Sequence, residues 1–293
     1  SSLKLTRILL EAGLPENGLQ CVTGSGSSVG MRLCSDKRIR KISFTGSTDV
    51  GEAITKAAGV KKLSLELGSN APVVILPDAD LDQVADATAI GGYINAGQVC
   101  ISTQRVIASH EVYADLLDAL KSRVEALKTG DPLQEGTKVS AMVTEKEAMR
   151  VEKWINEACS NGARLVTGGG RDKAVYEPTI VADVKPSMKI SCMELFGPAV
   201  AVTPVDDIDQ AISVVNDSSY GLGAGIFTRD INNAMRFARE AESGNVMINW
   251  TPLFRADFMP YGGCKQSGFG KEGPRYAIDE MTEIKTVVMH GMG

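Results

Sequence analysis

The chain has 293 residues, which is enough for a large hydrophobic core and predicts two domains by the usual domain length. It is 43% hydrophobic and 23% charged with a net charge of −5, so it excludes a disordered or fibrous protein and argues against nucleic acid or an anionic membrane surface as a partner. No apolar run approaches the roughly 20 residues of a membrane-spanning helix, and no signal-peptide pattern opens the chain.

The six cysteines are widely spaced and include no C-x-x-C pair, which is the spacing of zinc ribbons and thioredoxin-like motifs. We therefore expect free thiols in a reducing cytoplasm and no metal site. The chain begins with Ser1, and the apolar residues Leu3, Leu5 and Ile8 follow in a helical stretch with no earlier element to pack on. This start predicts a fragment or a processed part of a longer protein.

Short apolar runs alternate with helical stretches over the first third of the chain. Such alternation indicates an α/β fold with a parallel sheet, in which ligands bind at the carboxyl ends of the strands. The helix that begins near residue 80 has Asp78 or Asp80 as its N-terminal cap. The expected strands are Leu19–Thr23, Ile39–Phe44, Lys62–Glu66 and Pro72–Leu76, and the expected helices are Ser27–Cys34, Ser47–Ala58 and Asp80–Tyr93.

A second set of strands and helices follows, without an internal repeat or a low-complexity linker. Residues 252–273 are rich in Gly and aromatic side chains, which predicts a long functional loop. A short helix and a late strand at Thr282–Met289 end the chain. The other expected strands are Gln104–Ala108, Val200–Val205, Gly223–Phe227 and Asn245–Asn249, and the helices are Glu111–Lys128, Thr144–Asn161, Asp206–Asn216 and Ile231–Glu240.

Two glycine-rich turns compete for a phosphate-binding role. The turn that begins at Gly24 opens a helix, but three residues separate its second and third glycines, which departs from the dinucleotide fingerprint. At the second turn, Gly46 lets the backbone turn closely, and the Ser47 and Thr48 hydroxyls with the free N–H groups of the helix can hold a phosphate oxygen. A plain tight turn at Gly24 and an ordinary helix cap at Ser47 remain the alternatives.

Cys100 and Glu66 are the most informative pair of residues. Cys100 ends the loop Asn95–Cys100, and Glu66 ends an expected strand. The chain has only two histidines, so a nucleophilic thiol needs another residue as the base, and a carboxylate is the obvious candidate. A small buried hydrophobe is the alternative role for any lone cysteine.

Six motifs occur in order, namely Phe44–Ser47, Glu66–Ser69, Gly97–Cys100, Glu194–Pro198, Asn216–Leu222 and Pro260–Gly268. Together they strongly resemble the NAD(P)-dependent aldehyde dehydrogenase superfamily, over essentially the whole chain. The sequence departs from the family pattern at Ser69, where many relatives have Gly, and at Met193, where an acid is common. The chain resembles the later three-fifths of a member, without the part that carries the oxyanion asparagine and the lysine for the adenosine ribose.

This resemblance implies an α/β parallel-sheet sandwich with a partial Rossmann-like cofactor domain and an α/β catalytic domain. Residues 1–66 would be the remaining part of the dinucleotide-binding domain, residues 67–270 the catalytic domain, and residues 271–293 a C-terminal helix and tail strand for oligomerisation. Because Thr282–Met289 resembles the strand that pairs with a neighbouring subunit, a homodimer or homotetramer is expected.

The resemblance also divides the chemistry between the two residues of the pair. The Cys100 thiolate would attack the carbon of a small-molecule aldehyde, and Glu66 would activate water to hydrolyse the resulting thioester to a carboxylic acid. NAD or NADP would accept the hydride between these steps. The Cys100 backbone N–H would be one oxyanion donor.

The residues that the resemblance assigns to the cofactor lie in a few short motifs. Glu194 would hydrogen-bond the nicotinamide ribose, with Phe196 beside the ring. The Gly46 turn would hold the pyrophosphate, and the Gly24 turn would border the adenine. The full set is Gly24, Gly46, Ser47, Thr48, Val50, Gly51, Leu67, Gly68, Glu194 and Phe196.

Arg255 lies in a segment that resembles the substrate loop of the family. It would meet an anionic substituent on a small polar or acidic aldehyde, and a solvated loop charge is the alternative. Two other functions remain open, namely a non-catalytic or cofactor-deficient fragment and a thiol esterase. In the esterase, Cys100 and Glu66 would hydrolyse activated esters without a cofactor.

Overall fold

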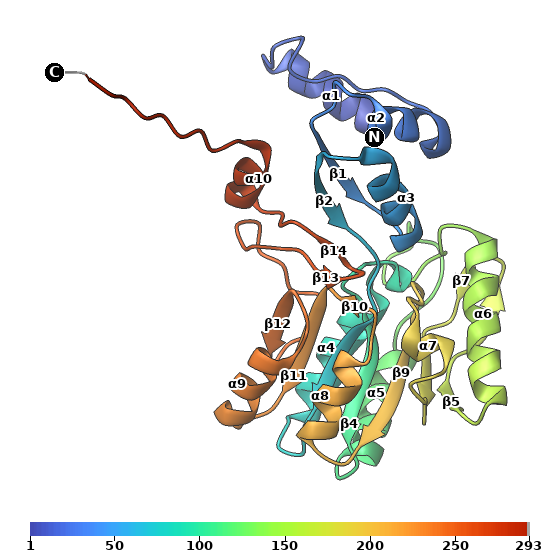
Figure 1. Cartoon of the computed structure of the whole chain (residues 1–293). Coiled ribbons are helices and arrows are strands. Elements are labelled where there is room, and N and C mark those ends of the chain that lie inside the picture. The colour runs from blue at the N-terminus through green and yellow to red at the C-terminus, as the bar shows by residue number, and fades with distance from the viewer. Residues whose placement is uncertain (292–293) are drawn as a thin grey trace.

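The structure, a computed structural model, describes residues 1–291 and contains two main sheets that meet near the middle of the molecule (Figure 1). One sheet has seven strands and the other has three. Parallel neighbours dominate the large sheet, and β1 and β2 of the small sheet are also parallel, so the predicted α/β class is confirmed.

The seven-stranded sheet has the order β12-β11-β3-β4-β9-β8-β5, and β5 runs antiparallel to its neighbour. Its central strands have apolar side chains on both faces, because Val73 and Val106 belong to one core and Val74 and Ile107 to the other. Strands that are buried on both faces are continuous apolar runs in the sequence. The strands are β3 (Ala71–Ile75), β4 (Thr103–Ser109), β5 (Arg164–Thr167), β8 (Thr179–Ala182), β9 (Ala199–Val205), β11 (Gly223–Phe227) and β12 (Asn245–Ile248).

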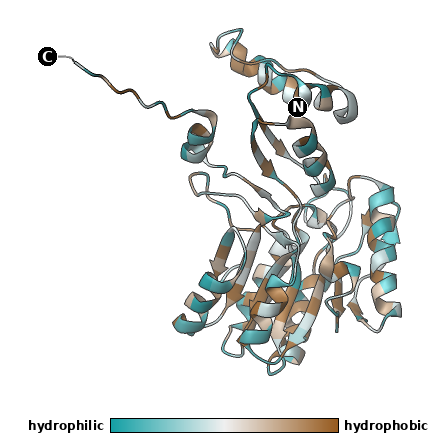
Figure 2. Cartoon of the chain, in the orientation of Figure 1, coloured by the Kyte–Doolittle hydropathy of each residue, from teal (hydrophilic) through white to brown (hydrophobic). Residues whose placement is uncertain are grey.

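Helices cover both faces of this sheet, and Figure 2 shows apolar strands between helices with polar outer faces. Helices α4 and α5 contribute to one core, and α8 and α9 to the other. The Asp80 side chain accepts a hydrogen bond from the Gln83 N–H and so caps α4, as predicted. The helices are α4 (Leu81–Tyr93), α5 (Tyr113–Glu125), α6 (Glu145–Ser160), α7 (Lys189–Cys192), α8 (Ile208–Asn216) and α9 (Ile231–Glu240).

The three-stranded sheet has the order β1-β2-β14 and a much smaller core. Its buried apolar side chains are Cys34, Ile54, Leu65 and Leu67. A π-helical turn at Gly26–Gly30 leads into α2, where one helix is predicted. The elements are β1 (Lys41–Thr45), β2 (Lys62–Glu66), β14 (Gly268–Phe269), α1 (Ser2–Glu11), α2 (Met31–Ser35) and α3 (Thr48–Ala58).

Residues 67–70 carry the chain from β2 of the small sheet directly to β3 of the large sheet. The chain returns through β14, which pairs antiparallel with β2. Residues 252–273 are mostly irregular, with the short strands β13 (Cys264–Lys265) and β14. The carboxyl ends of β1 and β2 therefore face the junction of the two sheets, where ligands are expected to bind.

One predicted strand is wrong, and another has no partner among the described residues of this chain. Leu19–Thr23 is irregular, because no described strand lies beside it to complete a hydrogen-bond ladder. Thr282–Met289 follows α10 (Pro274–Met281) as an extended but unpaired tail, with Ile284 100% exposed. A strand requires a neighbour, and Leu19–Thr23 has none within residues 1–291. The tail is predicted to pair with a strand of another subunit, and that pairing stays a prediction. The short strands β5 and β8, which have four residues each, were absent from the prediction.

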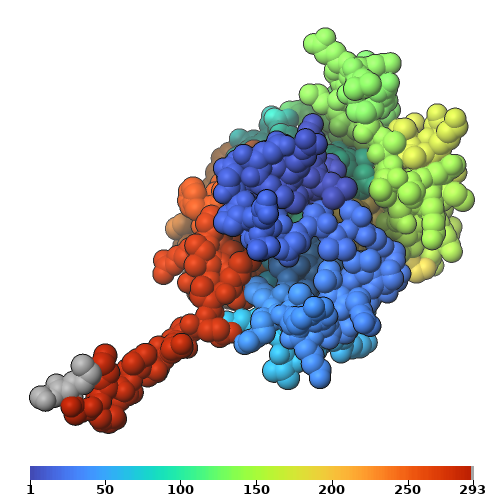
Figure 3. Space-filling view, turned by 90° about the horizontal axis from the view of Figure 1, so that it is seen from above, coloured from blue at the N-terminus to red at the C-terminus, as the bar shows by residue number. Residues whose placement is uncertain are grey.

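The space-filling view from above shows the N-terminal residues on the face toward the viewer and the tail up to residue 291 leading away from the body of the molecule (Figure 3). The exposed apolar side chains include Leu3 and Leu5 on α1 and Val287 on the tail. None of the helices between residues 1 and 291 combines the length and the apolar character that a bilayer crossing requires.

Candidate active site

The loop before Cys100 has an unusual backbone. Asn95, Ala96 and Gly97 all have left-handed conformations, with φ of 51°, 55° and 68°. A run of such residues is strained in a chain of L-amino acids. A Cβ on Gly97 would lie 2.0 Å from the Gly197 carbonyl oxygen, so only glycine fits there. Backbone strain of this kind is typical of a functional loop.

Side-chain amides hold the loop in this shape. Asn95 Nδ2 donates to the Gln98 carbonyl oxygen at 3.1 Å, and Gln98 Nε2 donates to the Asn95 carbonyl oxygen at 3.1 Å. Gln98 Oε1 accepts from the Val143 N–H at 2.8 Å. These bonds use both ends of the Gln98 amide and fix the segment that presents Cys100.

The Cys100 thiol is partly buried, and its sulfur lies 3.3 Å from the Tyr261 hydroxyl oxygen. Burial is the main cause that raises the pKa of Cys100, and the carboxylates of Glu66 and Glu194 raise it further. The Tyr261 hydroxyl and the N–H of Cys100 itself lower this pKa. The thiol is therefore in a carboxylate-rich site and has hydrogen bonds that favour its ionised form.

Glu66 ends β2, where the sequence places it, and is 5% exposed. Its Oε2 has no hydrogen-bond partner, and its Oε1 would lie 2.8 Å from a Cβ on Gly262. Burial, followed by the charge of Glu272, raises the pKa of Glu66 to about 7, against the lowering effect of Lys271 and Arg255. A carboxyl group with such a pKa can accept a proton near neutral pH.

Glu194 is tied to the crossover between the sheets. Its Oε1 accepts a hydrogen bond from the Ser69 N–H at 2.8 Å, and a Cβ on Gly68 would lie 2.7 Å from its Oε2. Burial raises the pKa of Glu194, whereas the Ser69 N–H and the charge of Arg150 lower it. The absence of a side chain at Gly68 therefore gives this carboxylate its room.

A buried glutamine, absent from the sequence prediction, supports this contact. Gln104 is 1% exposed and lies four residues after Cys100 on β4. Its Nε2 donates to the Ser69 carbonyl oxygen at 3.0 Å, and its Oε1 accepts from the Leu195 N–H at 2.7 Å. One amide thus joins the segments on which the Ser69–Glu194 bond depends.

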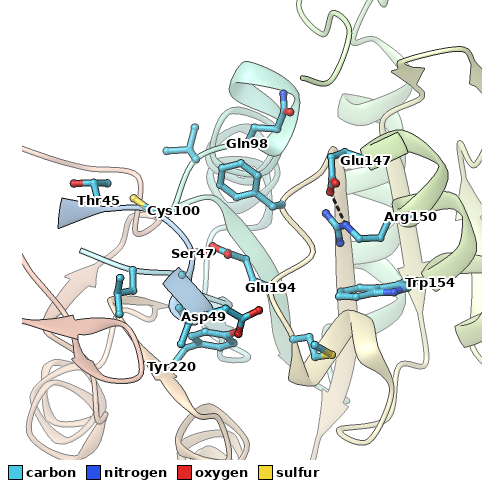
Figure 4. A pocket seen from close by; sticks show the side chains of 17 residues that line it. Thr45, Ser47, Asp49, Gln98, Cys100, Glu147, Arg150, Trp154, Glu194 and Tyr220 are labelled. Atoms are coloured by element: carbon cyan, nitrogen blue, oxygen red, sulfur yellow. Dashed lines mark hydrogen bonds and ion pairs between the residues drawn. The ribbon is translucent and has the colours of Figure 1, made fainter. Parts of the chain in front are cut away.

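A cleft of about 850 Å³ lies between the sheets (Figure 4). It brings together Cys100 and Glu194 from distant parts of the chain, and Glu66 lies outside its lining, beside Gly262. Of the residues predicted for the cofactor, those in its lining are Gly46, Ser47, Thr48, Leu67, Gly68, Glu194 and Phe196.

A second, more apolar cavity of about 740 Å³ lies between α2 and α3. Val50 lines it together with Gly26 and Ser27 of the first glycine-rich turn. Gly24 is outside this lining and lies against Val29, and Gly51 is on the buried face of α3 against Leu67. These two glycines therefore shape the walls around the cavities.

The sequence prediction also missed three aligned residues of α6, Glu147, Arg150 and Trp154. Arg150 forms an ion pair with Glu147 at 2.7 Å, donates to the Leu195 carbonyl oxygen and lies over the Trp154 ring. Figure 4 shows these side chains along one side of the cleft, with Cys100 across from them. Their i, i+3, i+7 spacing on one helix face was the available signal.

Arg255 lies outside the lining of the cleft. Its guanidinium is 4.1 Å from the centre of the Tyr261 ring and forms an ion pair with Glu272 at 2.7 Å. Asn70 and Asn95 are hydrogen-bonded elsewhere, to the Ser191 and Gln98 carbonyl oxygens. All six cysteines are free thiols, as predicted.

The comparisons with known proteins agree with one another. The sequence model described as the aldehyde dehydrogenase family matches residues 1–287. The 3-sulfolactaldehyde dehydrogenase of Priestia aryabhattai is 47% identical over 289 residues, which are 99% of this chain and 61% of that protein. The lactaldehyde dehydrogenase of Methanococcus aeolicus is 42% identical over 286 residues, which are 98% of this chain and 61% of that protein.

A solved structure gives the same result. The glyceraldehyde-3-phosphate dehydrogenase GapN of Methanocaldococcus jannaschii, complexed with NADP, superposes with a TM-score of 0.94 and 38% identity. The match covers 98% of this chain and 63% of that chain. The chain thus spans about 61% of the length of the curated relatives that it matches.

Proposed function

The chain belongs to the aldehyde dehydrogenase family, and on this basis we propose that its residues oxidise a small aldehyde to a carboxylic acid with NAD or NADP. The observation that carries the proposal is the partly buried Cys100 thiol, which a strained loop presents to the same cleft that Glu194 lines. In this role Cys100 is the nucleophile, Glu66 is the base, and the Gly46 turn, Gly68 and Glu194 hold the dinucleotide.

The first step forms a bond from Cys100 to the substrate. The thiolate attacks the aldehyde carbon and gives a thiohemiacetal, whose oxygen carries the negative charge. The Cys100 N–H, among the described residues, donates no hydrogen bond to a carbonyl oxygen, and so it can donate to this oxygen. Hydride loss converts the thiohemiacetal to a thioester on Cys100.

The residues at the two cavities fit a dinucleotide. The cleft has a helix N-terminus at Ser47 and Thr48, a carboxylate at Glu194 and the bare Cα of Gly68, and the apolar cavity lies beyond it past Val50. Helix N-terminal N–H groups suit a pyrophosphate, and a carboxylate suits the hydroxyls of a ribose. Bound in this way, NAD or NADP would supply the acceptor for the hydride.

The second step hydrolyses the thioester. Glu66 as the carboxylate accepts a proton from water, and the water oxygen attacks the thioester carbon. The carbon–sulfur bond breaks, the carboxylic acid leaves, and Cys100 regains its thiolate. A pKa of about 7 for Glu66 allows it to be ionised for this step and neutral while the Cys100 thiolate forms.

For the substrate, we propose a three-carbon 2-hydroxyaldehyde. The named substrates of the three relatives, sulfolactaldehyde, lactaldehyde and glyceraldehyde 3-phosphate, share this unit, and two of them add an anionic group. Arg255 is the candidate for contact with such a group, although it would have to leave Glu272 or share its charge. A larger loss of activity toward the anionic aldehydes than toward lactaldehyde in R255M would support this role.

We also propose the domain boundaries and the oligomerisation segment that the sequence predicts. Residues 1–66 would belong to the dinucleotide-binding domain, residues 67–270 to the catalytic domain, and residues 271–293 to an oligomerisation segment. The crossover at residues 67–70 between the two sheets supports the first boundary. The extended, unpaired residues 282–289 support a tail that pairs with a strand of another subunit in a homodimer or homotetramer.

Titration with NAD and with NADP tests the function directly. Trp154 lines the cleft, so a bound dinucleotide should quench its fluorescence in the wild type and in W250F but not in W154F. Reduced cofactor should then form with lactaldehyde or glyceraldehyde 3-phosphate in the wild type and not in C100A. Saturable binding of neither dinucleotide would reject the oxidoreductase in favour of a cofactor-deficient chain.

The esterase alternative has its own outcome in the same experiment. Turnover of nitrophenyl acetate in the absence of dinucleotide, lost in C100A, would show that Cys100 is an active nucleophile. If that turnover is present while no aldehyde is oxidised, the function is a thiol esterase. Unchanged activity in C100A would reject Cys100 as the nucleophile of either reaction.

A further inference from the structure

Tyr261 makes the side-chain hydrogen bond of the Cys100 sulfur, at 3.3 Å. The tyrosine is 3% exposed and packs with Ile101 and Leu222, so its ring has little freedom. Its backbone is held at both ends, since its N–H donates to the Glu272 carbonyl oxygen at 3.1 Å and its own carbonyl oxygen accepts from the Glu272 N–H at 2.6 Å. The hydroxyl is therefore a fixed donor aimed at the nucleophile.

We propose that Tyr261 is a catalytic residue whose hydroxyl donates a hydrogen bond to the Cys100 thiolate and stabilises it for attack. The proposal rests on the proposed function of Cys100 as the nucleophile. A thiolate only accepts hydrogen bonds, so the tyrosine must be the donor once Cys100 has ionised. Bonds from a neutral donor to an ion are stronger than bonds between neutral groups, so the contact strengthens when the charge appears.

The charges around Cys100 explain why a hydrogen bond to its sulfur matters. Glu66 and Glu194 both act against a negative charge on Cys100. The histidines of the chain are at positions 110 and 290, and His110 lies on the surface, where it pairs with Asp206. Among the described side chains, Tyr261 is thus the one that is placed to favour the thiolate directly. Burial raises the pKa of Tyr261 strongly, so the hydroxyl keeps the proton that it donates.

Arg255 adjusts the strength of the same bond. Its guanidinium carbon lies 4.1 Å from the centre of the Tyr261 ring, and its ion pair with Glu272 keeps it there. A cation over the face of an aromatic ring draws electron density from it, which makes the phenol a better donor. Arg255 thus acts on the Cys100 thiolate indirectly, through the Tyr261 hydroxyl.

The test measures ionisation of Cys100 without any aldehyde or dinucleotide. Wild type, Y261F and R255M are treated with iodoacetamide over a range of pH, and mass spectrometry follows alkylation of the peptide that contains Cys100. In Y261F the midpoint should rise by about one pH unit, which is the effect of one hydrogen bond to a charged group. R255M should shift it in the same direction by less.

Y113F is the matched control, because it removes a partly buried hydroxyl that bonds Asp183 away from the cleft. Its alkylation midpoint should equal that of the wild type, and thermal unfolding of Y261F should show that the variant folds. An unchanged midpoint in Y261F overturns the proposal, even if aldehyde oxidation falls, because the hydroxyl would then serve a later step. A shift in R255M at least as large as in Y261F also overturns it, because the cation itself would hold the thiolate.

Failure of the proposed function would look different. If no variant and no wild-type sample oxidises any aldehyde, the oxidoreductase is rejected, yet the alkylation midpoints still decide the role of Tyr261. If oxidation is present, Y261F should lose more of its rate at neutral pH than at alkaline pH, where Cys100 ionises without help. An equal loss at both values would contradict thiolate stabilisation.

Discussion

The seven-stranded sheet and the three-stranded sheet hold their parts of the site in different ways. The large sheet has apolar cores on both faces, and its strand β4 follows Cys100 directly and lies between β3 and β9. The small sheet carries the Gly46 turn and Glu66 on a core of four buried apolar side chains. Regions with more buried apolar contacts resist local unfolding better. We therefore expect the large sheet around Cys100 to be the more stable region. The small sheet, which we call the cofactor side, is expected to unfold locally more easily.

The largest expected effect is at the loop that joins Cys100 to the large sheet. In G97A the new Cβ would meet the Gly197 carbonyl oxygen, a backbone atom, at a residue with φ of 68°. Conformational strain and overpacking together should cost about 3–5 kcal/mol of unfolding free energy and abolish alkylation of Cys100 at neutral pH. Urea unfolding and mass spectrometry measure the two effects.

G136A is the matched control for this variant. Gly136 also has a positive φ, of 84°, but no atom lies within 4 Å of the position that a Cβ would take there, so the alanine adds only the conformational cost of about 1–2 kcal/mol. If G97A is no worse than G136A, the loop can move away from Gly197. The loop that presents Cys100 would then tolerate structural change as readily as the cofactor side, and the two regions would not differ in stability.

Cavities in the two cores test the comparison itself. Ile107 in β4 is 0% exposed and Leu65 in β2 is 1% exposed, so both truncations remove a fully buried side chain. We expect I107A to cost about 4 kcal/mol across the molecule and L65A about 2 kcal/mol, since a small core can collapse around the gap. Hydrogen exchange should then be faster over both sheets in I107A and over β1 and β2 alone in L65A. Global acceleration in L65A would mean that the sheets unfold as one unit.

Glu66 makes the stability of the small sheet depend on pH. Its pKa of about 7 in the folded chain lies above the ordinary value of 4.5, so between these values the folded state holds a proton that the unfolded state has lost. Stability therefore falls as the pH rises from about 4.5 to about 7, by about 3 kcal/mol in total. E66Q removes this dependence, so the wild type should lose more stability than E66Q between pH 5 and pH 8 in urea unfolding.

The control for E66Q is E52Q, which changes an exposed carboxylate of α3 that pairs loosely with Lys56. Its stability should follow the wild type at both pH values. If the wild type and E66Q show the same change, Glu66 is ionised in the folded chain at pH 5. It would then be a solvated group, and the junction between the sheets would be more open than its burial indicates.

The sequence predicted the elements with strong apolar periodicity and the residues with motif context. β2, β11 and α9 have the predicted bounds, and β3 and β4 differ from the predicted bounds by one residue at each end. The strand at Leu19–Thr23 failed because a strand needs a partner, which composition cannot supply. Local pattern thus predicts an element only where its neighbour is also present.

The same limit applies to the site. Cys100, Glu66 and Glu194 stand in recognisable motifs, so the sequence named them. Gln104 and Tyr261 act through contacts between residues 35 and 161 positions apart, which no local spacing encodes. Arg150 belonged to a visible helix face, but its charge near Glu194 depends on how α6 packs.

Gln104 crosses the junction between the two regions, and its loss should affect the cofactor side selectively. In Q104L the Ser69 carbonyl oxygen and the Leu195 N–H lose their partner while the volume is kept. We expect the KM for dinucleotide to rise about tenfold, which corresponds to about 1.4 kcal/mol, with an unchanged alkylation midpoint of Cys100. Q83L, which changes an exposed glutamine of α4, should alter neither quantity. Loss of thiol reactivity in Q104L would show that the two sides are not separable.

The smallest expected effect concerns the contact between α10 and the small sheet. Lys41 Nζ lies 2.7 Å from Glu280 Oε2, and the Ser64 hydroxyl donates to the same oxygen at 3.1 Å. The pair is only partly buried, so K41M should cost about 1 kcal/mol, compared with less for K62M, whose partner Glu283 is exposed. The Lys41 hydrogen bond, as the largest cause, lowers the pKa of Glu280, so this stabilisation is complete above about pH 4.5 and is lost as the pH falls. Hydrogen exchange of Pro274–Met281 should accelerate in K41M while β4 is unaffected. If hydrogen exchange of β4 also accelerates in K41M, α10 helps to stabilise the strand that follows Cys100. The less stable region would then be limited to β1 and the helices beside it.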